Sequence, residues 1–502
     1  MQPTHRWSRP VAAILLSTAL LLGCGTTVVN PVTGREERTV MDEATEITEG
    51  RKAHQQVLAE YGAYDNPALQ AYVNGVGQRL AKLSHRSELP WTFTVLDSNE
   101  INAFALPGGF IYITRGLMAY LDSEAELAGV IGHEIGHVTA RHGAQRATRQ
   151  QDAGLGVLAA TVLGAVLESQ GVGGATQAAS QVSQGVASGW LATYSREQEL
   201  QADQLGAEYL ARNRYNPSNM VDVIGVLKSQ EQFAADLARA EGRAAPSGAN
   251  WLSSHPSNDQ RLADIRRIAA GYQGDYGDDG RTRYLKAIDG MSFGESSAQG
   301  VTRGRNFFHE ELGIALTAPQ GWRIQNASEA IAVVNGAGDA GLIVRLVPAK
   351  AGKTHEEIIR NLIKPTEGRT EQRNIHGLAA TQFSGARRND QGQTQAVNVL
   401  LVSGPGNRNY LLNRGARDSA ALQRAAAGLA EAEGSFRPLD AAERAAARPW
   451  VLKTVSFPRG GFAELARSSP LPTQAEAQLK LLNSAYAGGA EPRAGQPVKV
   501  VR

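Results

Sequence analysis

The sequence has few cysteines, little net charge and no long apolar runs, and each of these absences excludes a class of protein. It has one cysteine among 502 residues, so no disulfide can form within the chain. Its 51 Lys and Arg residues nearly balance 49 Asp and Glu residues, and a formal charge of +2 gives no electrostatic reason to expect nucleic acid as a partner. The longest apolar runs are shorter than the about 18 residues that a membrane-spanning helix needs. What remains is a chain of ordinary hydrophobic content, 42%, long enough for two to four domains.

The N-terminus has the layout of a secretory signal, in which basic residues precede the apolar run Val11–Gly23. This run ends in Leu21-Leu22-Gly23-Cys24, which resembles a bacterial lipobox. The resemblance implies that residues 1–23 are a signal peptide and that lipidation of Cys24 anchors the protein in a membrane. Gly25 after the cysteine favours the outer membrane. The alternative is a plain secretory signal that contains a cysteine.

A candidate metal site lies in the segment His133-Glu134-Ile135-Gly136-His137. Ser123 and Glu126 form a capping-box pattern, and the following residues contain no proline, so we predict a helix over 125–141. Residues four apart share one helix face, which lets both imidazoles bind a single zinc ion while Glu134 reaches a water molecule beside it. The alternative is a helix with two ordinary histidines.

A catalytic zinc needs a third protein ligand, and the segment Ser195–Asp203 offers candidates. Glu199 is followed one turn later by Asp203, so one acid can bind the metal while the other orients a histidine. Glu197 points about 200° away from Glu199 on a helix and stays a competitor on spacing alone. His142 follows His137 by five residues rather than six, and the metzincin pattern therefore fails.

Three motifs in order carry a family resemblance: Asn102–Gly109, then HEIGHVTARH, then SREQELQAD. Over about residues 40–270 the chain resembles the zinc metallopeptidase family of HtpX, the CAAX prenyl endopeptidase and BepA. The resemblance implies a gluzincin fold with one Zn²⁺ per chain. In that family pattern the zinc ligands are His133, His137 and Glu199, the general base is Glu134, and Asp203 supports a ligand. It also implies an edge strand to which an extended substrate adds, formed by Asn102, Ala103, Phe104 and Ala105.

A His-Pro pair at His255-Pro256 matches a loop that members of this family carry near the cleft. The resemblance implies that His255 is a catalytic residue, either closing the open metal position or donating a proton to the oxyanion. The bland alternative is a histidine in a solvated loop.

We expect an α+β protein. A tether (24–42) precedes a mainly helical peptidase domain with a small sheet (43–290). Within this domain we expect Gly154–Gly189 to form packed small-residue helices or a flap, and the alternative is a segment that contacts the membrane. Residues 305–438 resemble a PsbP-like α+β module, through Gly313–Pro319 and Gly321-Trp322. Residues 447–502 resemble a LysM-like module, which would bind peptidoglycan, or form a structural cap.

These expectations together describe a lipid-anchored zinc endopeptidase on the periplasmic side of the bacterial envelope. Its substrates would be unfolded or misassembled envelope proteins, because an edge strand reads extended backbone rather than a folded surface. Two other functions stay open. One is a cell-wall-binding scaffold with a silent metal site, and the other is a peptidase that acts on peptidoglycan peptides.

Overall fold

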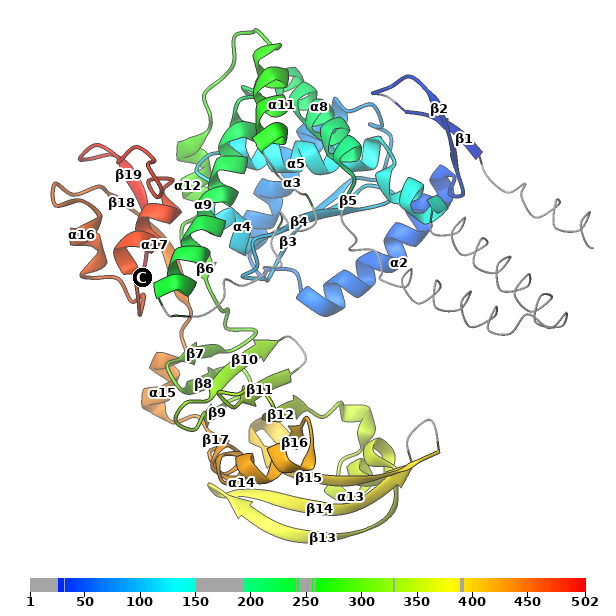
Figure 1. Ribbon diagram of the computed structural model, residues 1–502, viewed down its shortest axis with the longest axis vertical. Coiled ribbons are helices and arrows are strands. Elements are labelled where there is room, and N and C mark those ends of the chain that lie inside the picture. The colour runs from blue at the N-terminus through cyan, green and yellow to red at the C-terminus, as the bar shows by residue number, and fades with distance from the viewer. Residues whose placement is uncertain are drawn as a thin grey trace, which may run out of the picture. The chain divides into compact units, whose positions relative to one another are not determined.

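The computed structural model describes residues 26–30, 32–149, 194–240, 242, 251, 255, 259–327, 330–388 and 392–502 (Figure 1). Cys24, the signal peptide and the Gly154–Gly189 segment lie outside these residues. The chain forms two compact units, and helices and open sheets in both confirm the α+β class. The first unit comprises the residues up to Asp289 together with Thr454–Val500, and the second comprises Gly290–Lys453 and the last two residues.

Helix α5 (Glu124–Thr139) runs through the core of the first unit, and all of its residues are buried. Ser123 is its N-cap and accepts a hydrogen bond from the Glu126 N–H, as the capping pattern predicts. The carboxyl group of Glu126 accepts a hydrogen bond from the N–H of Asp122 instead of that of Ser123, so only half of the capping box forms. The helices around α5 are α2 (Glu43–Tyr61), α3 (Pro67–Lys82), α4 (Arg115–Tyr120), α8 (Arg196–Arg212), α9 (Asn219–Ala240), α11 (Asp259–Ala270) and α12 (Arg281–Ile288).

Glycine on α5 allows α8 to approach it closely. A Cβ atom added at Gly136 would lie 2.8 Å from the carbonyl oxygen of Ala202 on α8. The neighbouring crossing point pairs Gly132 with Gly206, where an added Cβ on Gly132 would lie 3.4 Å from the Gly206 oxygen. This backbone contact brings the acidic residues of α8 within reach of the α5 histidines.

A small sheet of three strands completes this part of the unit, in the order β3 (Thr92–Leu96), β5 (Phe110–Thr114), β4 (Ala103–Leu106). β3 is parallel to β5, and β4 is antiparallel to it, with Ala105 opposite Ile111. The sequence predicts a small sheet within the mainly helical peptidase domain, and these three strands confirm it. β4 lies at the edge of the sheet, and a two-stranded hairpin, β1 (Thr26–Val29) and β2 (Glu36–Thr39), precedes α2.

The C-terminal segment packs into the first unit, although the sequence suggests a separate module over 447–502. Its elements are α16 (Gly461–Ala466), α17 (Ala475–Leu482) and β19 (Pro497–Val501). The buried ammonium group of Lys499 donates to the carbonyls of Ala119 and Leu121 and lies 3.1 Å from a carboxylate oxygen of Asp122. This strand is thereby tied to the residues that lead into α5.

The second unit contains a seven-stranded antiparallel sheet in the order β10-β11-β12-β16-β15-β14-β13. Its strands are β10 (Arg323–Ala327), β11 (Ala330–Val334), β12 (Ala340–Leu346), β13 (Pro365–Ile375), β14 (Leu378–Arg388), β15 (Thr394–Gly404) and β16 (Arg408–Ala416). Helix α14 (Ser419–Gly434) packs on one face through Leu429, and α13 (His355–Ile358) with the π-helical turn Ile359–Ile363 packs on the other through Ile363. The remaining elements are β6 (Ser292–Phe293), β7 (Val301–Arg303), β8 (Asn306–His309), β9 (Ile314–Thr317), β17 (Arg437–Pro438), α15 (Ala441–Ala446), β18 (Trp450–Ser456) and the short turns at 349–351 and 405–407.

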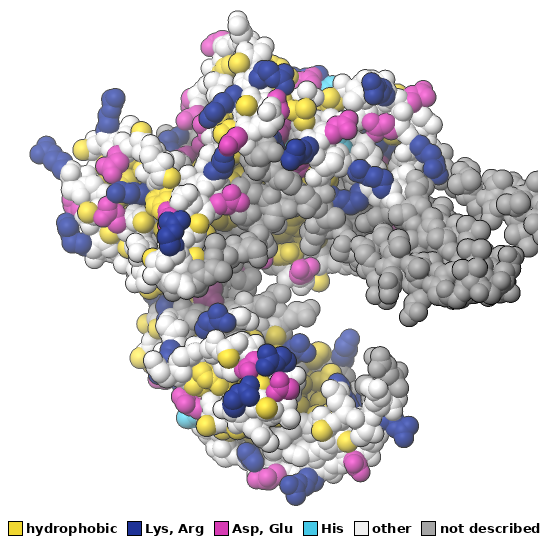
Figure 2. Space-filling model, in the orientation of Figure 1, with side chains coloured by type: hydrophobic (Ala, Val, Ile, Leu, Met, Phe, Trp, Pro, Cys, Tyr) yellow, Lys and Arg dark blue, Asp and Glu magenta, His cyan; other side chains and the backbone are white. Residues whose placement is uncertain are grey.

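Among the described residues, none of the helices combines the length and apolarity needed to cross a membrane. Basic and acidic side chains are interspersed over the visible face (Figure 2), as the near-zero net charge suggests.

Candidate metal centre

Four side chains that can bind a metal converge in the first unit: His133 and His137 from α5, Glu199 from α8, and His255. One ligand atom of each lies within 4.8 Å of the others, and all four residues are buried. The Nε2 atoms of His133 and His137 are 3.0 Å apart, and the Glu199 carboxylate oxygens lie 3.6 Å and 3.5 Å from them. Glu197, the competing candidate, is exposed.

Hydrogen bonds orient the two α5 imidazoles. His133 uses Nδ1 to contact Asp203 Oδ1 at 2.9 Å, so its proton lies on that nitrogen and the Nε2 lone pair faces the cluster. Burial alone would lower the pKa of His133, but the Asp203 contact outweighs it and the pKa is raised. A more basic imidazole is a stronger metal ligand.

His137 is oriented through a chain of two more side chains. His142 Nε2 lies 3.1 Å from Gln201 Oε1, an acceptor, so His142 carries its proton on Nε2 and accepts with Nδ1. The 2.8 Å contact between His142 Nδ1 and His137 Nδ1 then places the His137 proton on Nδ1 and directs its Nε2 lone pair into the cluster. Burial lowers the pKa of His142 to about 4 and that of His137 well below its usual value, so both rings are neutral at physiological pH.

Arg261 on α11 holds both acids of α8. It donates two hydrogen bonds to Asp203, each 2.9 Å long, and its guanidinium lies 2.7 Å from Glu199 Oε2. Burial would raise the pKa of Asp203, but Arg261 outweighs burial and the pKa is about 2. The pKa of Glu199 is also lowered, because His255 and Arg261 outweigh its burial. Both carboxylates are therefore ionised, as metal coordination and histidine orientation require.

Glu134 is fully buried beside the cluster. The indole N–H of Trp251 donates to its Oε1 atom at 3.0 Å. Its Oε2 atom is buried and has no hydrogen-bond partner among the described residues. Such an orphaned oxygen is costly unless a bound water or ligand satisfies it. The donor set of two imidazoles with inward-facing lone pairs and an ionised carboxylate, with this free oxygen next to it, fits a zinc ion and a water molecule.

His255 lies in the cluster rather than in a solvated loop. Its Nδ1 atom is 3.0 Å from Glu199 Oε1 and 3.2 Å from His133 Nε2. Its ring stacks on Trp251 with centroids 4.7 Å apart, and its carbonyl accepts a hydrogen bond from Arg261. The residue therefore occupies the space where a fourth ligand would lie.

The predicted substrate strand approaches the same place. Ala105 and Leu106 of β4 line a small hollow together with His137 and Tyr194. The Tyr194 ring stacks on His137 at a centroid distance of 3.9 Å. Asn102 lies just before the strand, where its N–H is bonded to the Thr114 hydroxyl. The edge position of β4 is thus next to the histidine cluster.

Three contributors escape sequence reasoning. His142 fails the metzincin spacing but is bonded to His137, and Trp251 and Tyr194 belong to no sequence motif. The spacing in the sequence is a usable signal for Trp251, which lies four residues before His255. The N–H of His255 donates to the carbonyl of Trp251 at 2.9 Å, as in one turn of helix.

Residues 67–269 match the family model described as Peptidase family M48. The Beta-barrel assembly-enhancing protease of Yersinia pestis is 31% identical over 210 residues, which cover 41% of this chain and 40% of that protein. The putative beta-barrel assembly-enhancing protease of Vibrio cholerae is 32% identical over 214 residues, with 41% and 40% covered. The mitochondrial metalloendopeptidase OMA1 of Bos taurus is 27% identical over 267 residues, with 48% and 45% covered. The chain therefore spans less than half the length of these relatives.

Two solved structures are similar at a low level. The solution structure of cyanobacterial PsbP from Synechocystis has a TM-score of 0.20 and 11% identity, and covers 28% of this chain and 98% of that one. LpqN of Mycobacterium tuberculosis, involved in cell envelope biogenesis, has a TM-score of 0.20 and 18% identity, with 25% and 83% covered. The PsbP-like and LysM-like interpretations stay predictions.

Proposed function

We propose that this protein is a zinc-dependent endopeptidase, because residues 67–269 match the model of peptidase family M48. The observation that carries the proposal is the convergence of His133, His137 and Glu199, with the free oxygen of Glu134 buried beside them. These three residues would hold a zinc ion, which would supply the Lewis acidity that activates water and polarises a carbonyl oxygen.

The chain's own residues account for the rest of the mechanism. Glu134 is the general base that takes a proton from the attacking water and returns it to the leaving amine. Trp251 holds the other carboxylate oxygen, so the free oxygen is the one that accepts this proton. Asp203 and His142 keep the ligand lone pairs directed at the metal, and Arg261 keeps Glu199 and Asp203 ionised.

An extended substrate adds to the open edge of β4, at Asn102, Ala103, Phe104 and Ala105. Main-chain hydrogen bonds along this edge tolerate varied side chains, which suits unfolded polypeptides. The hollow shared by Ala105 and His137 supports the passage of a substrate backbone from the strand to the metal ligands.

The test is cleavage of casein by a Glu134→Gln variant. This change removes the base but no metal ligand, so we expect full zinc content, an unchanged melting temperature and a loss of cleavage of at least about 1000-fold. Glu197→Gln, on the exposed side of the same region, is the matched control and should cleave normally. Retained cleavage by the Glu134 variant, or loss of its zinc, would show that Glu134 has another role.

We also propose that the enzyme works on the periplasmic side of the bacterial envelope, anchored in the outer membrane by lipidation of Cys24, and removes unfolded or misassembled envelope proteins. The lipobox-like sequence and the relatives that are named beta-barrel assembly-enhancing proteases support this. A Cys24→Ala variant should move to the soluble periplasmic fraction while the purified enzyme keeps its activity. If it stayed with the membrane, the anchor would have to lie elsewhere.

A further inference from the structure

The large sheet of the second unit is split between two neighbouring strands. β15 pairs with β16 only from Val399 opposite Asn413 to Gly404 opposite Arg408. Beyond Val399, residues 394–398 of β15 pair with β14 alone, and residues 414–416 of β16 pair with β12 alone. The two strands therefore diverge into a fork, and each presents an unpaired backbone edge to the gap.

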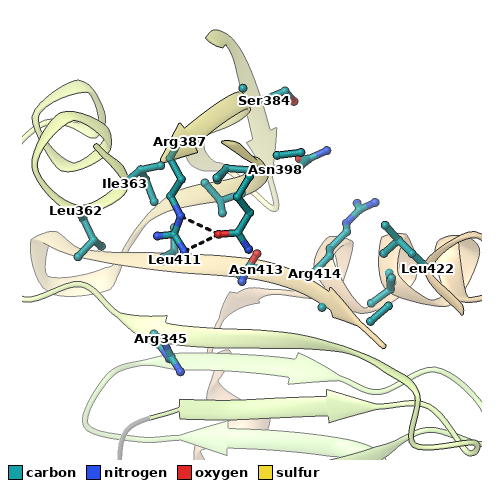
Figure 3. Close-up of a pocket in the computed structure, with 18 of the residues that line it drawn as sticks. Arg345, Leu362, Ile363, Ser384, Arg387, Asn398, Leu411, Asn413, Arg414 and Leu422 are labelled. Atoms are coloured by element: carbon teal, nitrogen blue, oxygen red, sulfur yellow. Dashed lines mark hydrogen bonds between the residues drawn. The ribbon is translucent and has the colours of Figure 1, made fainter. Parts of the chain in front are cut away.

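A cavity of about 1440 Å³ fills this fork. Its lining includes the consecutive residues 395–399 of β15 and 413–416 of β16. Because side chains alternate between the two faces of a strand, a cavity lined by consecutive residues must face the strand's backbone edge. Figure 3 shows Asn398 and Asn413 from these two strands on opposite sides of the gap. Open edges of this kind bind another strand through main-chain hydrogen bonds.

Apolar side chains rim the fork. Five large hydrophobic residues are exposed in the described part of the chain, and three of them, Leu346, Leu362 and Leu422, line this cavity at 47%, 40% and 41% exposure. Leu362 lies on the π-helical turn and Leu422 on α14 (Figure 3), and these two elements pack on opposite faces of the sheet, whereas Leu346 is the last residue of strand β12. An added strand would thus meet apolar contacts on both of its faces, and such clustering of exposed leucines marks a binding surface.

The charged groups of the cavity favour an acidic ligand. Arg387 donates only to the neutral side chain of Gln395 (Figure 3), and the described residues provide no ion pair for it or for Arg345. Arg414 is paired with Glu433, and Asp418, the one acid among the described residues of the lining, caps α14. Two arginines are therefore available to carboxylates of a ligand.

We propose that this fork binds an extended, acidic polypeptide segment with apolar side chains, which adds as a strand to the open edge of β15. That edge of five residues spans about 16 Å. This inference deepens the proposed function. It rests on that function in one respect, namely that the bound segment belongs to an unfolded substrate. A lipid could contact the leucines and the arginines but forms no strand hydrogen bonds with the open backbone edges. A peptide accounts for the leucines, the arginines and the open edges together.

The test measures fluorescence anisotropy of a labelled peptide of about ten residues, an extended length of about 33 Å, in which pairs of valines alternate with pairs of glutamates so that both faces of the strand carry valine. The protein is the full chain carrying Glu134→Gln to prevent cleavage. We expect saturable binding, and at least tenfold weaker binding of the same peptide with alternate backbone amides methylated, because methylation removes strand hydrogen bonds and keeps the side chains. Arg387→Glu should weaken binding at least fivefold. Arg369→Glu, on the exposed outer strand β13 and outside the cavity, is the matched control and should leave binding unchanged.

Equal binding of the methylated peptide, or equal effects of the two arginine variants, would overturn the proposal. Binding to phosphatidylglycerol vesicles without binding to the peptide would overturn it in favour of a lipid site. Failure of the peptidase proposal is detected separately, because casein cleavage is measured with the unmodified chain and anisotropy needs no catalysis.

Discussion

Replacing Lys499 by methionine removes a buried charge that joins the C-terminal strand to the start of α5. This ammonium donates hydrogen bonds to the carbonyls of Ala119 and Leu121 and forms an ion pair with the carboxylate of Asp122. Methionine matches the length of lysine and remains compatible with the buried position, so the change tests the polar contacts rather than packing.

The cost follows from the groups left behind. Removing one partner of a buried ion pair costs about 3–5 kcal/mol. Asp122 keeps a second partner, since Arg281 lies 3.3 Å away, but two carbonyls lose their donor. We therefore expect a loss of about 2–4 kcal/mol in unfolding free energy. For a unit of more than 300 residues that lowers the melting temperature by about 3–6 °C.

Differential scanning calorimetry of the purified chain, with zinc content followed over the same temperatures, measures this effect. Lys480→Met is the matched control in the same segment, because Lys480 forms a surface pair with Glu476 that should contribute less than about 1 kcal/mol. We expect the Lys499 variant alone to unfold early and to lose zinc with that transition, since α5 carries two ligands. Equal melting temperatures for the two variants would refute the view that residues 454–500 are an integral part of the peptidase unit.

Three further predictions concern the site and its helix. Glu199→Ala should lose zinc by atomic absorption while Glu197→Ala keeps it, because only Glu199 faces the histidines; equal zinc content would disprove the third-ligand assignment. His255→Ala should keep zinc but change the rate of casein cleavage several-fold, since His255 fills the fourth position, and unchanged cleavage would return it to a structural role. Burial, and then the charge of Asp122, raise the pKa of Glu126 from 4.5 to about 8, so the free energy of unfolding should fall as the pH rises between these two values. Glu126→Gln should abolish this pH dependence in thermal melts, and an unchanged dependence would contradict the assignment.

The two helices that carry the metal-binding residues, α5 and α8, can be predicted because their sequence patterns are local. A capping serine, an unbroken helical pattern and the four-residue spacing of the histidines place α5 correctly. Glu199 and Asp203 follow from one helical turn, whereas the choice between Glu199 and Glu197 needed the packing of α8 on α5. Strands β11 and β12 carry a local signal as well, because apolar residues alternate along them and place Val333, Leu342 and Val344 in the core.

Strand β13 could not be predicted in this way. Its residues, Pro365–Ile375, are polar and exposed along nearly the whole length, so they show no alternation. The strand forms because its backbone pairs with that of β14, which follows it directly in the chain. The residues of β13 contribute no hydrophobic pattern that would predict this pairing. Polar edge strands of this kind leave no pattern for a sequence-based method to use.

The N-terminal segment shows the same limit at the metal centre. Asn30, in a turn-rich stretch that the sequence suggests is a tether, is buried, and its amide donates to Gln201 Oε1 at 3.2 Å. Gln201 in turn accepts from His142, whose acceptor nitrogen fixes the proton of His137. The orientation of one metal-facing lone pair thus depends on a residue six positions after the predicted lipidation site. Because each bond in this chain constrains the next, the segment that links the anchor to the domain is also part of what holds the histidine in place.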